Sequence, residues 1–130
     1  MSTLASSHVM AFVATCDPQR ARAFYEDVLG LRLVEDEPFA LVFDANGTTL
    51  RIAKVPALVP AGYTVLGWVV SDIAAGVAAL QHRGVMFERF PGMTQDALGI
   101  CTFPNGSRVA WFKDPDGNTL SLTQPAGRAG

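Results

Sequence analysis

The stretch that decides the fold runs from Val109 to Gln124 and reads VAWFKDPDGNTLSLTQ. Its ends, VAWF and TLSLTQ, are short runs rich in β-branched and aromatic residues, which is typical of strands. Between them, Pro115 fixes the backbone angle φ, while Asp116 and Gly117 supply the side-chain acceptor and the left-handed freedom that a tight turn needs. The stretch therefore predicts two strands joined by a tight turn.

A helix signal occurs twice in the chain, each time after an apolar run. Asp17 and Asp72 stand at the start of the two predicted helices, 55 residues apart. Aspartate is a favoured residue at a helix start because its carboxylate accepts hydrogen bonds from the first backbone N–H groups. Each predicted helix ends at a glycine, Gly30 or Gly84, and strand residues follow, at 85–88 in the second copy. The chain therefore contains two copies of one β-α-β-β-β unit.

The turn signal is repeated as well. ANGTTLRI at 45–52 aligns with PDGNTLSL at 115–122, and the turn glycines of the two stretches are 70 residues apart. Because this offset exceeds the offset of the helix starts by 15, the second copy contains about 15 additional residues before its turn. The added segment, about 92–108, includes a hairpin signal at Asn105. Two interpretations stay open for this segment: a lid over a pocket or a packed hairpin.

The two copies define the expected domain organisation. One copy alone is too short to enclose a core of useful size. We therefore expect a single domain over 1–130, built from modules at about 8–55 and 62–124. The expected fold class is α+β, in which two paired βαβββ modules form a cupped mixed β-sheet with the helices outside.

Composition limits the possible partners. The chain has 130 residues, 49% of them apolar, and a formal net charge of −2, which gives no electrostatic case for nucleic acid or an anionic membrane. Its apolar runs are far shorter than the roughly 20 residues of a membrane span. The first residues lack the pattern of a secretory signal, and Cys16 and Cys101 form no disulfide framework. We therefore expect a cytoplasmic protein.

On two motifs the sequence resembles the vicinal oxygen chelate superfamily, which includes glyoxalase I, bleomycin resistance proteins and extradiol dioxygenases. The motifs are ARAFYEDVLGLRLV at 21–34 and VAWFKDPDGNTLSLTQ at 109–124, and the resemblance extends from about His8 to Gln124. It implies the paired βαβββ fold. The family includes isomerases, transferases, dioxygenases and binding proteins, so the fold alone does not give the function.

The resemblance also implies where a metal ion would bind. In metal-dependent members each copy supplies two ligands. One lies seven residues before the aspartate that starts the helix, and the other lies four residues after the turn glycine. Here these positions are occupied by Met10 and Val65, and by Arg51 and Ser121. A divalent ion of this kind needs imidazole nitrogen or carboxylate oxygen, which none of the four supplies. The sequence therefore predicts a member with no metal and no other cofactor.

The inward-facing strand residues predict a pocket for a small-molecule ligand. Arg51 either pairs with a carboxylate or phosphate of the ligand or reaches an internal carboxylate or a dimer partner. Trp111 and Tyr63 either stack on a flat ligand or belong to the core. His8 becomes a metal ligand only if the edge strand slips in register. The candidate ligand-binding residues are Arg51, Ser121, Met10, Val65, His8, Tyr63, Thr49 and Trp111.

The leading hypothesis is a metal-independent protein that binds a small organic molecule in the sheet cup and, as the resemblance implies, forms a homodimer. The guanidinium of Arg51 admits an anionic ligand. One alternative is a lyase, isomerase or dioxygenase of the glyoxalase type with a non-standard site, and another is a non-catalytic interaction module. Whether the protein is an enzyme stays open at this point.

Overall fold

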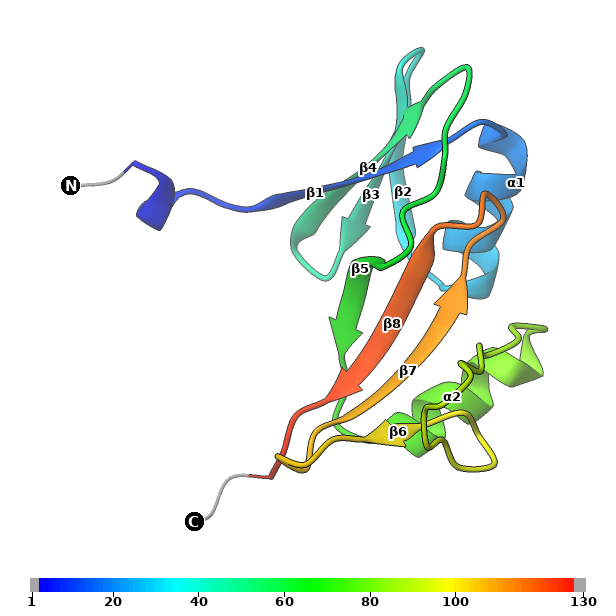
Figure 1. Cartoon of the computed structure of the whole chain (residues 1–130). Helices are drawn as coiled ribbons and strands as arrows, with labels where there is room; N and C mark the ends of the chain where they lie inside the picture. The colour runs from blue at the N-terminus through cyan, green and yellow to red at the C-terminus, as the bar shows by residue number, and fades with distance from the viewer. Residues whose placement is uncertain (1–2, 128–130) are drawn as a thin grey trace. The chain divides into compact units, whose positions relative to one another are not determined.

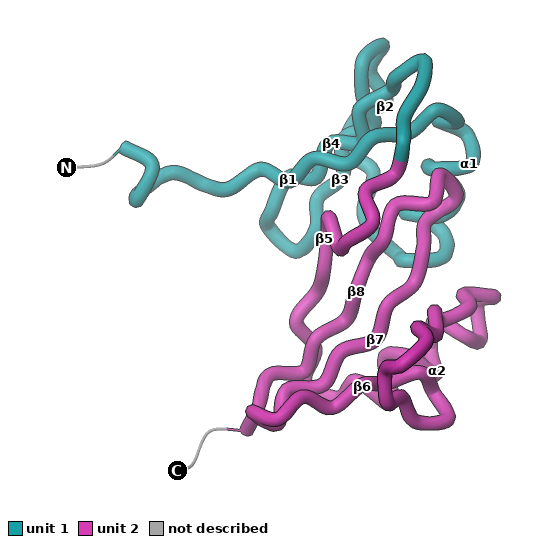
Figure 2. The backbone as a smooth tube through the Cα atoms, viewed as in Figure 1, with its two compact units in different colours: residues 1–59 teal, residues 60–130 magenta. Residues whose placement is uncertain are grey.

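The computed structural model describes residues 3–127, which form two compact units (Figure 2). Unit 1 ends at Val59 and unit 2 begins at Pro60. Each unit contains a four-stranded mixed sheet and few helices, as expected for the α+β class. No helix within residues 3–127 is long and apolar enough to cross a membrane.

Unit 1 is built around a sheet in the strand order β1-β4-β3-β2, with β1 parallel to β4 and the other neighbours antiparallel (Figure 1). Two short helical segments follow β1 directly, the second of them a π-helical turn. The elements of unit 1 are η1 (Leu4–Ser6), β1 (Met10–Thr15), α1 (Pro18–Arg22), η2 (Ala23–Val28), β2 (Arg32–Asp36), β3 (Ala40–Ala45) and β4 (Thr48–Lys54).

The first predicted helix start is confirmed. The Asp17 side chain accepts a hydrogen bond from the backbone N–H of Arg20, and a proline occupies the first helical turn. Tyr25 is fully buried, and its ring centroid lies 6.0 Å from that of Phe43 in the sheet. Gly30 then adopts a φ of 75°, which ends the helical segment and starts β2.

Unit 1 has one buried and one open sheet face. Leu50 and Ile52 of β4 are almost completely buried, whereas Arg51 between them is only partly buried. On the edge strand β1, Met10 and Phe12 are 47% and 61% exposed. Since side chains alternate between the two faces of a strand, the helix-covered face forms the core and the face with Arg51 stays accessible.

Unit 2 repeats this arrangement with the strand order β5-β8-β7-β6, in which β5 is parallel to β8. Asp72 caps its helix by accepting a hydrogen bond from the N–H of Ala75, so the second predicted helix start is also confirmed. The Gln124 side chain accepts from the N–H of Ile73 and holds the same helix end. The elements of unit 2 are β5 (Thr64–Val69), α2 (Ile73–His82), β6 (Cys101–Thr102), β7 (Arg108–Lys113) and β8 (Thr119–Gln124).

The predicted turn between β7 and β8 is present. Asp114 is 5% exposed, and its carboxylate accepts hydrogen bonds from the backbone N–H groups of Asp116 and Asn118. Gly117 has a φ of 87°, a conformation that glycine adopts without strain. The carboxylate therefore fixes the turn that sets the register of β7 against β8.

One predicted strand is shorter than the sequence indicates. Instead of a strand at 85–88, unit 2 has a single bridge between Phe87 and Phe112. The next backbone groups bond elsewhere: the Gln95 side chain donates to the carbonyl of Glu88 and accepts from the N–H of Phe90. Beyond the bridge, this side chain and not a neighbouring strand pairs with the backbone. Further along, β6 and β7 form the hairpin predicted from the asparagine-glycine pair.

Candidate functional site

The candidate site lies on the sheet face of unit 2 that points away from α2. Trp68 and Leu122 share the helix-covered face, since a Cβ atom on Gly76 of α2 would lie 3.2 Å from Leu122 Cδ1. Trp111 pairs with Ser121 across β7 and β8, one register position away, and therefore belongs to the opposite face.

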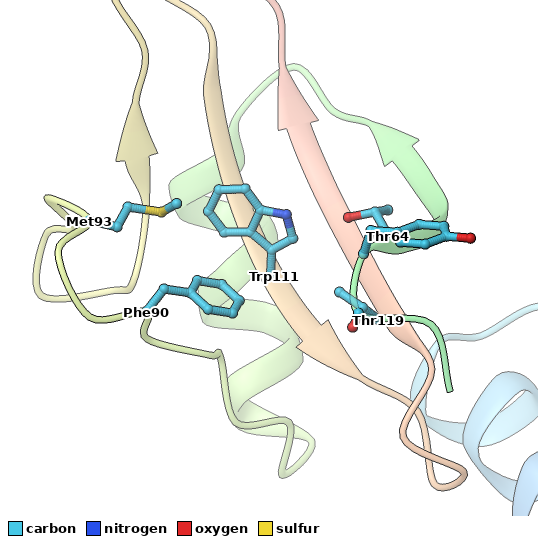
Figure 3. Close-up of a pocket in the computed structure, with 7 residues that line it drawn as sticks. Thr64, Phe90, Met93, Trp111 and Thr119 are labelled. Atoms are coloured by element: carbon cyan, nitrogen blue, oxygen red, sulfur yellow. The ribbon is translucent and has the colours of Figure 1, made fainter. Parts of the chain in front are cut away.

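On this opposite face a pocket of about 220 Å³ opens between β5, β7, β8 and the loop 89–100 (Figure 3). In the close-up, Trp111 lies between Phe90 and Met93 on one side and Thr64 and Thr119 on the other. The residues that line the pocket are Gly62, Tyr63, Thr64, Phe90, Met93, Trp111 and Thr119.

A β-bulge shapes the β5 wall of this pocket. Thr64 pairs with Thr119, but the next pair is Leu66 with Leu120, so one residue of β5 has no partner. A bulge interrupts the simple alternation of side chains. Because of it, Thr64 lies on the same face as its partner Thr119 and lines the pocket beside Tyr63, which precedes β5.

The aromatic wall is a contact network around Trp111. Its ring centroid lies 5.4 Å from that of Phe90 and 6.3 Å from that of Phe103, with both pairs close to perpendicular. Such edge-to-face pairs fix the orientation of the rings. Trp111 is nevertheless only partly buried, so part of its indole ring stays available to a ligand.

The polar groups of the pocket are uncharged and available. The side-chain hydroxyls of Tyr63, Thr64 and Thr119 and the indole N–H of Trp111 have no protein hydrogen-bond partner within residues 3–127. No lining residue is an acid, a lysine or an arginine. The pocket can therefore hold a flat apolar molecule and offer it hydrogen bonds without an ionic contact.

The remaining candidates lie elsewhere. Arg51 in unit 1 donates to Glu37 at 2.6 Å, and both side chains are about three-quarters buried, so an internal carboxylate occupies the guanidinium. Thr49 is half-buried and pairs with the exposed Met10 across β1 and β4. His8 is exposed and precedes β1.

The four family metal positions do not fit a metal ion. In unit 1, Met10 pairs with Thr49 and Arg51 pairs with Phe12, so the two positions are two register steps apart, and they offer a thioether and a cation. In unit 2, Val65 and Ser121 contribute an aliphatic side chain and a hydroxyl. Among the residues that the structure describes, no group of three or more histidine, cysteine, aspartate or glutamate side chains is arranged to hold a metal.

Ser121 and Val65 do not line the pocket, although both belong to the same unit. Ser121 is 6% exposed, and its hydroxyl faces Gly67 on β5, where an added Cβ atom would come within 2.8 Å of the Ser121 Oγ atom. The absence of a side chain at Gly67 therefore gives this hydroxyl its room.

Sequence reasoning did not identify Phe90, Gly62 or Thr64 as site residues. Thr64 depends on the bulge, and Phe90 depends on the path of the loop 89–100, neither of which has a clear signal in the residue pattern. Met93 was expected only as part of the added segment. Trp111 and Tyr63 are the two predicted candidates that the structure brings together in the pocket.

Comparisons with known proteins place this chain in a family. The model of the Glyoxalase/Bleomycin resistance protein/Dioxygenase superfamily matches residues 6–122, which confirms the resemblance inferred from the motifs. A comparison with curated protein sequences gives no match.

Solved structures give the same fold. An antibiotic binding protein, TnmS3 from a Streptomyces species, is 30% identical with a TM-score of 0.69, and the match covers 93% of this chain and 97% of that one. A superfamily member from Sphaerobacter thermophilus is 28% identical with a TM-score of 0.69, and the match covers 92% and 97%. Lactoylglutathione lyase from Agrobacterium tumefaciens is 19% identical with a TM-score of 0.70 over 92% and 93%, a likeness of fold alone.

Proposed function

The chain belongs to the glyoxalase/bleomycin resistance protein/dioxygenase superfamily, and we propose that it binds a small, uncharged, aromatic organic molecule in the pocket of unit 2, without a metal ion. The observation that carries this proposal is the lining of that pocket. It combines aromatic and thioether side chains with available hydroxyls and contains no charged group. Such a lining favours a flat ligand with one or two hydrogen-bonding groups.

The similarity to the antibiotic binding protein supports a binding role. That relative is 30% identical over nearly the full length of both chains, and its name describes binding rather than turnover. The likeness to lactoylglutathione lyase is one of fold only and supports no reaction here. The residues at the family metal positions likewise give a divalent ion no suitable ligands.

The proposal has two further parts, an ionic contact at Arg51 and a homodimer. Arg51 stays a proposed contact for an acidic group of a ligand, which would have to compete with Glu37 for the guanidinium. The protein is proposed to form a homodimer in the cytoplasm. Support for the dimer comes from the exposed apolar side chains Met10 and Phe12 on the open face of unit 1.

A fluorescence titration with two matched probes tests the proposal. N-phenyl-1-naphthylamine is an uncharged aromatic fluorophore, and 8-anilinonaphthalene-1-sulfonate is the same ring system with an added negative charge. We expect saturable binding of the uncharged probe to each chain, and weaker binding of the sulfonate, because the pocket lacks a cation to compensate the cost of removing that charge from water.

Three outcomes would contradict the proposed site or replace the proposed function. Absence of saturable binding by the uncharged probe contradicts the proposed site. Tighter binding of the sulfonate, lost on Arg51→Gln, moves the site to the predicted anion contact of unit 1. Turnover of the hemithioacetal of methylglyoxal and glutathione, abolished by a chelator, replaces binding with the enzyme alternative.

A further inference from the structure

The loop 89–100, which carries two of the pocket residues, is fastened by the side chains of Gln95, Arg89 and Asp96. The Gln95 amide nitrogen donates to the carbonyl of Glu88 at 2.9 Å and to that of Gly99 at 2.8 Å. Its amide oxygen accepts from the N–H of Phe90 at 2.8 Å. Gln95 therefore uses both its donors and its acceptor on backbone groups from the two ends of the loop.

Charged side chains close the same loop from outside. Arg89 donates to the carbonyls of Asp96 and Ala97. The Asp96 carboxylate accepts from the N–H groups of Leu98 and Ile100, and the Asp96 N–H donates to the carbonyl of Ile100. Arg89 therefore also joins the start of the loop to its end, whereas Gln95 is the one of these three side chains that bonds to the backbone of Phe90, a pocket residue.

This fastening reaches the pocket through Phe90. The N–H of Phe90 is held by Gln95, its carbonyl accepts from the N–H of Met93, and its ring meets Trp111 at 5.4 Å. We propose that Gln95 is a positioning residue that keeps the Phe90–Met93 wall formed before a ligand arrives, so that this loop is a fixed wall rather than a closing lid. The inference rests on the proposed function of the pocket and adds what holds the site ready.

A preformed wall has a kinetic signature. When only a fraction of the molecules has the wall in place, the apparent dissociation constant rises by the inverse of that fraction. Because the bound complex is unchanged, the loss of affinity comes from a lower association rate, and the dissociation rate stays the same. If Gln95 contributed only to the stability of the fold, its loss would lower the melting temperature without slowing association selectively.

The experiment compares two glutamine-to-alanine variants of the full chain. Gln95→Ala removes the three Gln95 hydrogen bonds and leaves those of Arg89 and Asp96 in place. Gln124→Ala removes the helix contact with Ile73, a side-chain hydrogen bond in the same unit that does not involve the pocket. Stopped-flow fluorescence with N-phenyl-1-naphthylamine measures both rates. We expect Gln95→Ala to raise the dissociation constant at least about fivefold through slower association, and Gln124→Ala to leave both rates unchanged.

Amide hydrogen exchange on the unliganded protein supplies an independent readout. The N–H groups of Gly99 and Ile100 bond to Asp96 and not to Gln95, so their exchange reports the order of the loop rather than the lost bond itself. We expect faster exchange at both in Gln95→Ala only. Unchanged exchange and unchanged association in Gln95→Ala overturn the inference. If the wild-type protein does not bind the probe, the proposed function fails, and the exchange measurement still decides whether Gln95 holds the wall.

Discussion

The two tryptophans of unit 2 offer a matched test of the pocket. Trp111 lines the pocket and contacts two aromatic rings, whereas Trp68 lies on the helix-covered face and stacks on Phe112 at 6.5 Å. Replacing each by leucine removes an indole ring from the same unit but from opposite faces of one sheet. The two variants therefore separate an effect on ligand binding from an effect on folding.

The stability effects follow from the ring contacts. An aromatic pair contributes about 0.5–1.5 kcal/mol beyond its buried area, so Trp111→Leu loses about 1–3 kcal/mol and Trp68→Leu about half as much. For a chain of this length each kcal/mol corresponds to about 3–5 °C in melting temperature. Both variants are expected to melt at lower temperature than the wild type, and differential scanning calorimetry measures the difference.

The effects on affinity are expected to differ more sharply. If the ligand forms one aromatic contact with Trp111, its loss is worth about 0.5–1.5 kcal/mol, or about two- to thirteenfold in the dissociation constant. Trp68→Leu is expected to leave the affinity for N-phenyl-1-naphthylamine within about twofold, the scatter ordinarily found between distant sites. Equal losses in the two variants, or an unchanged affinity in a folded Trp111→Leu protein, refute the reasoning.

Three further predictions concern the metal, the ion pair and the dimer. Mn²⁺, Co²⁺, Ni²⁺ and Zn²⁺ are expected to leave the melting temperature of chelator-treated protein unchanged; an ion at 100 times its dissociation constant would add about 2.7 kcal/mol, a shift of several degrees that would contradict a metal-free site. Arg51→Gln leaves Glu37 unpaired and is expected to cost about 1–2 kcal/mol of stability in urea unfolding, while a more than fivefold loss of probe affinity would show that Arg51 reaches the ligand. Phe12→Asp places a charge on the open face of unit 1 and is expected to weaken the homodimer in sedimentation velocity, whereas a monomeric wild type would contradict the proposed interface.

The parts of the fold that sequence reasoning predicted correctly are those with a local cause. The side chains of Asp17 and Asp72 each accept a hydrogen bond from the backbone N–H three residues later and so cap their helices. Gly30 and Gly84 end the helical segments with positive φ values. Each signal acts over a few residues, so it is visible in the sequence. The repeat strengthens the prediction because the helix-start and helix-end signals recur at nearly equal offsets, 55 residues for the aspartates and 54 for the glycines.

The parts that could not be predicted depend on contacts between distant residues. The strand expected at 85–88 is reduced to a single bridge: the Val85 N–H bonds back to Leu80 at the helix end, and Gln95, seven residues after Glu88, takes the Glu88 carbonyl. The bulge that brings Thr64 into the pocket is a matter of register between β5 and β8. Neither alternation nor propensity determines such a register, and for this reason the candidate site was predicted only in part.

The fate of the family metal positions links fold and function in this chain. A charged side chain on the open face of a sheet needs a partner where it is partly removed from water, because an unpaired charge there is costly. In unit 1 the arginine at such a position is satisfied within its own unit by Glu37. In unit 2 the corresponding position holds Ser121, whose hydroxyl fits over a glycine and lies outside the pocket lining. The accessible hydrogen-bonding groups lie instead beside Trp111, so the surface available for recognition on unit 2 is aromatic and neutral. Such a surface is the basis of the proposed binding role, in which aromatic rings contact a flat ligand and the hydroxyl and indole groups offer it hydrogen bonds.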